Sequence, residues 1–128
     1  MTTPEAGDVY EFERSFTTED VERFAAVSQD TQPQHVEPDE DGRLMVHGLL
    51  TATLPTKIGG DLEVLAHTME FTFHRPVYTG ETVRCTWTNE SVEERADRYW
   101  LVVGLECRNE DDETVLSGSI SGIVWKEG

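Results

Sequence analysis

From about residue 65 onward, the chain contains a succession of strand patterns with no helical pattern between them. Apolar and polar residues alternate in AHTMEFTFHRPV, which indicates a strand with one buried face. Three later runs also have strand character: TVRCTWTNESVEE, YWLVVGLECRN and TVLSGSISGIVWK. Because parallel neighbours would need long crossover connections, we expect these strands to pair antiparallel. Their sheet must then bury its apolar face against an element from the first half of the chain.

The segment VHGLLTATLPTKIGG is the best candidate for that element, as a helix that begins near His47 or Gly48 and ends by Gly59–Gly60. Its apolar residues cover too much of the circumference for an ordinary surface helix, so we expect a buried helix. These residues are Leu49, Leu50, Ala52, Leu54 and Ile58. Pro55 is expected to kink this helix or to end its first part, because the ring removes one hydrogen bond and crowds a preceding carbonyl.

The N-terminal part predicts one strand followed by one short helix. The alternation in VYEFERSF indicates the strand, and Thr17 with Asp20 can form a capping box at the start of the helix. The apolar face of the helix is predicted to comprise Val21, Phe24, Ala25 and Val27. Pro33 restricts the residue before it to extended conformations, so the helix should end near SQDTQPQ. Asp30 and His35 are therefore expected on a loop that leaves the helix.

This order of elements favours an α+β hot-dog fold, in which an antiparallel β-sheet wraps around a central buried helix. A length of 128 residues suits one domain, and we expect a single domain over residues 1–128. Periodicity alone would also allow a different layering of helices on the sheet.

The charge of the chain excludes some partners. Asp and Glu total 26 against 10 Lys and Arg, for a formal net charge of −16, which repels nucleic acids and anionic membranes. No stretch approaches the roughly 18 apolar residues of a spanning helix, so we expect a cytoplasmic protein. Lys57 and Lys126 are the only lysines, and an acidic, lysine-poor composition suggests a halophilic source. An ordinary acidic protein is the alternative.

The sequence indicates neither a disulfide nor a metal centre. Cys85 and Cys107 lie in strand-like runs and form no CxxC pair, so we expect reduced, structural thiols. The stretch HVEPDED offers possible hard-metal ligands, but its spacing matches no strong metal signature. We therefore predict no metal site.

The stretch FAAVSQDTQPQH resembles the motif of the MaoC-like (R)-specific enoyl-CoA hydratases, aromatic-Ala-x-x-Ser-Gly-Asp-x-Asn-Pro-x-His. Further on, VHGLLTA resembles the His-Gly segment that opens the hot-dog helix of this family, and FTFHRPVYTGETV resembles its later strand-turn-strand piece. The resemblance covers roughly residues 10 to 126. The residues that match the motif are Phe24, Ala25, Ser28, Asp30, Pro33 and His35.

The resemblance implies a lyase that adds water to 2-enoyl thioesters, with Asp30 as the principal base and His35 as its partner. Hydration needs a base that takes a proton from water as oxygen attacks C3, and an acid that protonates C2. The thioester carbonyl acquires enolate charge, and the amide of Gly48 at the start of the helix is the expected oxyanion donor. His47 could orient this turn, although a histidine beside a helix start is more often structural.

The resemblance also implies an acyl-CoA substrate, no cofactor beyond coenzyme A carried as the thioester, and a homodimer. Coenzyme A carries phosphates, which local basic residues would have to attract to so acidic a protein. Arg75, Arg84 and Lys57 are candidates by their proximity to the family-like segments, and the sequence does not choose among them.

Three positions depart from the family pattern, Gln29 at the glycine, Gln32 at the asparagine and Asp41 at a small residue. Gln29 either adopts positive φ at a cost in strain, or lies at ordinary negative φ with its side chain in solvent. We favour negative φ, because the loop keeps Asp30 and His35 in register.

Other functions stay open. Asp30 could be only a turn residue and His35 only structural, which would leave a non-catalytic acyl-CoA-binding module or a partner subunit. A thioesterase on the same fold would need an acid on or beside the buried helix, and no carboxylate lies between Gly48 and Gly60.

Overall fold

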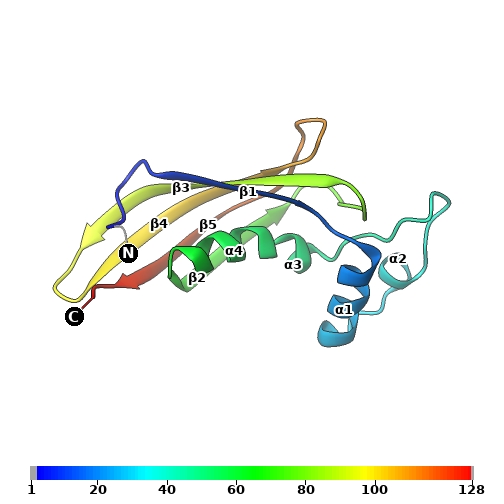
Figure 1. Ribbon diagram of the computed structural model, residues 1–128, viewed down its shortest axis with the longest axis horizontal. Helices are drawn as coiled ribbons and strands as arrows, with labels where there is room; N and C mark the ends of the chain where they lie inside the picture. The colour runs from blue at the N-terminus through cyan, green and yellow to red at the C-terminus, as the bar shows by residue number, and fades with distance from the viewer. Residues whose placement is uncertain (1–2, 128) are drawn as a thin grey trace.

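A computed structural model describes residues 3–127 of the chain (Figure 1). The terminal residues 1, 2 and 128 of the predicted domain lie outside the described residues. In chain order the elements are β1 (Val9–Ser15), α1 (Thr18–Ser28), α2 (Pro33–Val36), α3 (Gly48–Thr51), α4 (Thr53–Asp61), β2 (Leu65–Phe73), β3 (Thr82–Glu94), β4 (Arg98–Arg108) and β5 (Thr114–Trp125).

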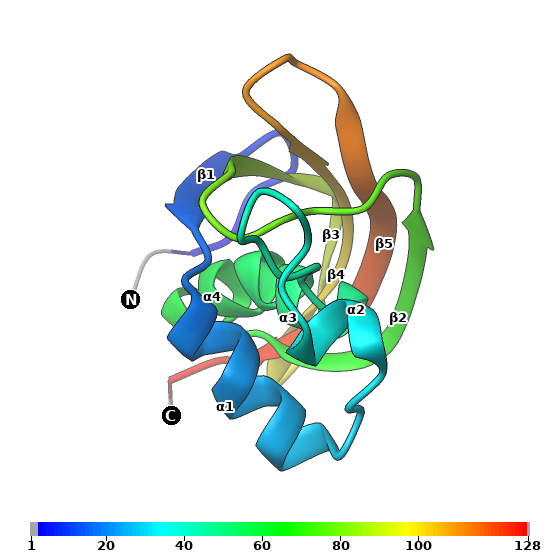
Figure 2. The same cartoon turned by 90° about the vertical axis from the view of Figure 1, so that its right-hand side faces the viewer.

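The strands form one five-stranded antiparallel sheet in the order β1-β3-β4-β5-β2. The sheet curves around α4, which lies along its concave face (Figures 1 and 2). This arrangement confirms the predicted α+β hot-dog fold. None of the helices in the described chain is long and apolar enough to cross a membrane.

The core lies between the concave face of the sheet and α4. Leu54 and Ile58 of α4 are almost fully buried, as is Trp87 of β3. A Cβ atom at Gly59 would lie 3.3 Å from the Trp87 ring, so the glycine lets helix and sheet approach closely. The Trp87 indole donates to the Oδ1 of buried Asn89 at 2.9 Å, which satisfies both polar groups inside the core.

The predicted buried helix is divided in two at Ala52. Pro55 is the third residue of α4 and cannot donate to the carbonyl of Thr51, which explains the break that the sequence predicted. The expected burial of Leu49 is wrong, because this side chain is 63% exposed. Leu49 belongs to α3, which packs against α4 more than against the sheet, so the sheet does not cover its side chain.

The start of α1 agrees with the sequence. Thr17 and Asp20 form the predicted capping box, and Arg14 adds an ion pair to Asp20 at 2.7 Å. Backbone and side-chain hydrogen bonds from Thr17, together with Arg14, hold the pKa of the Asp20 carboxyl below its usual range. The predicted burial of Val27 is wrong, because α1 projects beyond the end of the sheet and this side chain is 84% exposed (Figure 1).

The predicted loop from Asp30 to His35 is correct only at its start. Gln32 is extended as expected, with φ −56° and ψ 147°, but Pro33 opens the short helix α2, which carries His35. Proline is well tolerated at a first helical position, because its missing N–H would have no partner there.

The two cysteines are free and buried, as predicted, and face one another across β3 and β4. A hydrogen bond with Cys85 and burial raise the pKa of the Cys107 thiol.

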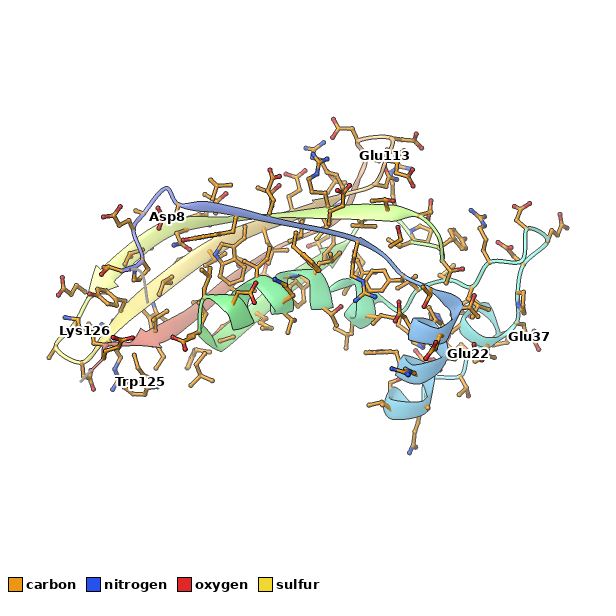
Figure 3. The ribbon with its side chains drawn as sticks, viewed as in Figure 1. Asp8, Glu22, Glu37, Glu113, Trp125 and Lys126 are labelled. Atoms are coloured by element: carbon orange, nitrogen blue, oxygen red, sulfur yellow. The ribbon has the colours of Figure 1, made fainter. Side chains whose placement is uncertain are left out.

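Acidic side chains extend from well-separated places on the surface, as the labelled Asp8, Glu22, Glu37 and Glu113 show in Figure 3.

Candidate active site

Asp30 and His35 come together just beyond α1, where the chain turns into α2. The Asp30 Oδ2 atom lies 3.7 Å from the His35 Nε2 atom. The His35 side chain is 8% exposed and the Asp30 side chain 38% exposed, so one member of the pair is enclosed and the other reaches water.

The backbone before Asp30 is left-handed. Gln29 has φ 62° and ψ 19°, so the negative φ that we favoured from the sequence is wrong. The reason is local: α1 ends here with an αL cap, and the Gln29 N–H donates to the Ala25 carbonyl at 2.8 Å. The Asp30 N–H then donates to the Ser28 Oγ at 3.1 Å. The turn at Gln29 thus directs Asp30 away from the helix axis.

The second departure from the motif, Gln32, contacts the Asp30 carboxylate directly. Its Nε2 donates to Asp30 Oδ1 at 2.9 Å and its backbone N–H to the same oxygen at 3.3 Å. The side-chain hydrogen bond from Gln32 is the largest cause that lowers the pKa of Asp30, and the backbone bond and the neighbouring histidines act in the same direction. Oδ1 is therefore engaged, while Oδ2 faces His35.

The tautomer of His35 follows from its other nitrogen. His35 Nδ1 lies 2.7 Å from the carbonyl oxygen of Met45, and because a carbonyl only accepts, Nδ1 must carry the proton. The Met45 N–H donates back to the Gln34 carbonyl at 2.9 Å, which ties α2 to the strand-like segment before α3. His35 Nε2 is left as the nitrogen that can exchange a proton with water or substrate.

A cavity of about 410 Å³ lies beside this pair. Its walls include His35, Gly48, Thr51, Phe73, Arg75 and Val115, whereas Asp30 is not among the lining residues. Gly48 is the first residue of α3, so its amide has no partner within the helix. A Cβ atom at Gly48 would lie 2.8 Å from the Phe73 ring. His35 and Gly48 thus line one cavity. Asp30 is not part of the cavity wall and faces the Nε2 atom of His35.

A larger cavity, of about 470 Å³, lies near the C-terminal end of α4 and contains none of the predicted site residues. Tyr10, Leu62, Val64 and Asn89 are among its walls. We place the candidate site at the smaller cavity, because only that one combines a histidine with a free helix amide.

Sequence reasoning underestimated His47. Its ring lies face to face with the His35 ring, with centroids 3.7 Å apart and planes at 14°, and it is 3% exposed. The segment VHG that opens the helix was the available signal, but a stacked pair of histidines from separate segments is a tertiary feature that no spacing reveals.

Candidate ligand atoms of Asp30, His35 and His47 all lie within 4.8 Å of one another, a grouping close enough to raise the question of a metal ion. A metal binds along a nitrogen lone pair, which lies in the ring plane. The two rings are stacked and nearly parallel, so their lone pairs do not converge on one point. The arrangement does not suit a metal ion, and the absence of a metal stays a prediction.

The three basic residues that were candidates for coenzyme A binding lie in different parts of the structure. Arg75 lines the cavity and pairs with Glu113 at 3.1 Å. Arg84 points to Glu13 on β1, and Lys57 of α4 pairs with Asp61, so neither of these two lines the cavity.

The third departure from the motif, Asp41, contacts residues outside the candidate site. It lies in an exposed turn, where its N–H donates to Asp39 Oδ1 and its carboxylate is 3.8 Å from Arg43 Nη2. The expectation that it bears on the chemistry finds no support in these contacts.

An antiparallel sheet wrapped around α4, with an acid and a histidine near the N-terminus of the preceding helix α3, defines a hot-dog protein with a candidate acid–base pair. A family model described as MaoC like domain matches residues 2–106, and the chain belongs to this family.

Two solved structures illustrate the likeness of the fold. One is the R-hydratase PhaJ1 from Pseudomonas aeruginosa, with a TM-score of 0.83 and 21% identity over 98% of this chain and 84% of that one. The other is the (R)-hydratase from A. caviae involved in PHA biosynthesis, with a TM-score of 0.82 and 21% identity over 95% of this chain and 98% of that one. Among curated proteins, the mitochondrial 3-hydroxyacyl-[acyl-carrier-protein] dehydratase of Arabidopsis thaliana is 25% identical over 136 residues, covering 96% of this chain and 79% of the relative.

Proposed function

We propose that the protein is a hydro-lyase that adds water to 2-enoyl-CoA thioesters and yields (R)-3-hydroxyacyl-CoA. The observation that carries the proposal is the approach of Asp30 Oδ2 to His35 Nε2, 3.7 Å apart beside a cavity. The family membership and the named activities of the solved relatives support the same reaction class.

The distance between the two atoms suits one shared water. A water about 2.8 Å from each could direct one hydrogen to Asp30 Oδ2 and the other to His35 Nε2. The lowered pKa of Asp30 favours the carboxylate, which accepts a proton from the water as its oxygen attacks C3. The proton that Asp30 takes from the water then passes to C2 from the same face, either directly or through His35 Nε2, which restores the carboxylate and adds the elements of water to one side of the double bond.

Gly48 is the proposed oxyanion donor. Its N–H has no partner within α3, and Gly48 lines the cavity that His35 also lines. As the thioester carbonyl gains enolate charge, this amide would donate to it.

We favour coenzyme A over a carrier protein as the acyl carrier. A carrier protein that is itself acidic would be repelled by a protein of net charge −16, whereas the small phosphates of coenzyme A need only a local cation. Arg75 lines the cavity and is 56% exposed, so it is the proposed phosphate contact, at the expense of its ion pair with Glu113.

We further propose a homodimer in the cytoplasm. β2 is an edge strand of the sheet, and its Leu65, Met69 and Phe73 are 61%, 48% and 51% exposed. An exposed, partly apolar edge invites pairing with a second strand. Free cysteines that face one another in the core are consistent with a reducing compartment.

The test is loss of the conjugated thioester absorbance of crotonyl-CoA and longer 2-enoyl-CoAs in molar KCl, followed by chiral analysis of the product. Asp30→Asn and His35→Gln are each expected to lower kcat by about 100-fold or more, the usual scale for a general acid–base group. Asp41→Asn removes the same charge in an exposed turn and serves as the matched control.

Folded Asp30 and His35 variants with undiminished turnover would refute the assignment. Saturable binding of acyl-CoA without turnover in the wild-type protein would instead support the non-catalytic module. Sedimentation of the wild-type protein against Met69→Lys tests the dimer.

A further inference from the structure

We propose that His47 is a positioning residue that holds both members of the Asp30–His35 pair through one ring. This inference rests on the proposed hydratase function for its kinetic test, and on geometry alone for its structural test. His47 does not line the cavity, so the role is one of position and not of contact with substrate.

The first contact fixes the backbone of Asp30. His47 Nε2 lies 3.0 Å from the Asp30 carbonyl oxygen, and because a carbonyl only accepts, Nε2 carries the proton and donates. This bond joins the residue before α3 to the turn after α1, two segments 17 positions apart in sequence. It holds the Asp30 main chain next to Gln29, whose left-handed backbone is less favourable than an ordinary right-handed or extended conformation.

The second contact fixes the ring plane of His35. The two imidazoles are stacked with centroids 3.7 Å apart, and Phe24 packs against His47 at 4.8 Å and 55°. Rotation of the His35 ring would therefore clash with His47 as well as break the bond from Nδ1 to Met45. The stack thus helps to keep His35 Nε2 directed toward Asp30 Oδ2.

The third observation argues against a purely space-filling role. His47 Nδ1 is buried and has no hydrogen-bond partner within residues 3–127. A buried polar atom without a partner is unfavourable for folding, and a phenyl ring would fill the same space without it. The buried Nδ1 atom therefore lowers the stability of the fold, and the hydrogen bond from Nε2–H to Asp30 offsets this cost.

Two substitutions separate the two contacts. His47→Phe keeps a ring to stack on His35 and removes the donor to Asp30. His47→Gln keeps an N–H donor at a similar reach and removes the ring. His67→Gln is the matched control, because His67 lies on β2, where its ring hydrogen-bonds Thr68 and packs edge-on against Trp100.

The kinetic test measures kcat and KM for crotonyl-CoA hydration. Misplacement of a catalytic group by about 1 Å can lower the rate on the order of 100-fold, so we expect kcat to fall about 10- to 100-fold in each His47 variant. KM is expected to stay within about twofold, because His47 lies outside the cavity wall, and His67→Gln should match wild type.

The structural test needs no turnover. Nitrogen-15 NMR of the ring of His35 should report a single Nδ1–H tautomer in the wild type, and broadened or averaged ring signals in His47→Gln. An unfolded His47→Phe would leave His47→Gln to decide.

Unchanged kcat in both folded variants, unchanged His35 ring signals, or a rise in KM alone would each overturn the proposal. If the wild-type protein hydrates no enoyl thioester, the proposed function fails and the NMR result alone decides the role of His47.

Discussion

The left-handed backbone of Gln29 gives the most direct prediction. A residue other than glycine at φ 62° crowds its Cβ against the backbone, which costs about 1 to 2 kcal/mol. Glycine removes that crowding but makes the unfolded chain more flexible, which costs about 0.4 to 1 kcal/mol. Gln29→Gly is therefore expected to raise the free energy of unfolding by about 0.8 kcal/mol, the difference between the midpoints of these two ranges.

For a chain of 128 residues, this gain corresponds to a rise in Tm of about 2 to 5 °C. Two variants calibrate the measurement by thermal denaturation. Glu63→Gly changes another exposed residue at positive φ, 58°, and should give a similar gain away from the candidate site. Glu22→Gly changes an exposed position inside α1, where glycine should lower stability by about 0.5 to 1 kcal/mol.

Hydration should not fall in Gln29→Gly, because glycine adopts the same φ and the hydrogen bonds of the turn involve the backbone. If Gln29→Gly loses stability to the same extent as Glu22→Gly, the left-handed conformation carries no strain and the reasoning is refuted. If stability rises while kcat collapses, the Gln29 side chain has a role that its contacts do not reveal.

Three further predictions concern the site, the helix cap and the surface. Gly48→Ala should lower kcat at least tenfold, because the new Cβ atom obstructs the Gly48 amide. Its Tm should change by only a few degrees, because the Phe73 ring that the Cβ displaces is half-exposed. A normal kcat would remove Gly48 from the mechanism. Asp20→Ala should lower the free energy of unfolding by about 1 kcal/mol. Because the folded pKa of Asp20 is lowered, its stabilisation is present above the unfolded pKa near 3.8 and is lost as pH falls through the folded pKa, so wild type and variant should converge in urea unfolding at low pH. The Tm should rise as KCl goes from tenths molar to molar, since ions screen the repulsion within a chain of charge −16, and a flat curve would contradict a halophilic origin.

The features that sequence predicted well are those that neighbouring residues decide. The capping box depends on Thr17 and Asp20, three positions apart, and the break before α4 depends on the missing N–H of Pro55. The alternation along β3, β4 and β5 likewise reflects one buried face. Such features predicted the hot-dog fold before any contact was known.

The features that sequence missed depend on distant parts of the chain. Val27 continues the apolar face of α1, but the sheet ends before it, so the helical pattern alone could not predict its exposure. His47 stacks on a ring twelve positions earlier, only because α2 and the segment before α3 are joined through Met45. Hydrophobic periodicity predicts neither the exposure of Val27 nor the stacking of His47 on His35.

The two departures nearest to Asp30 keep chemical features of the motif residues that they replace. Gln29 takes the left-handed conformation that suits glycine, and Gln32 supplies an amide donor, as asparagine would, at 2.9 Å from Asp30 Oδ1. The left-handed backbone of Gln29 also ends α1, whereas the charge-assisted hydrogen bond from Gln32 acts on the Asp30 carboxylate itself. The hydrogen bond from Gln32 favours the ionised form of the Asp30 carboxylate, and the turn at Gln29 precedes the residue whose Oδ2 atom faces His35. The geometry around Asp30 therefore supports the proposed hydratase over the alternative of a non-catalytic binding module.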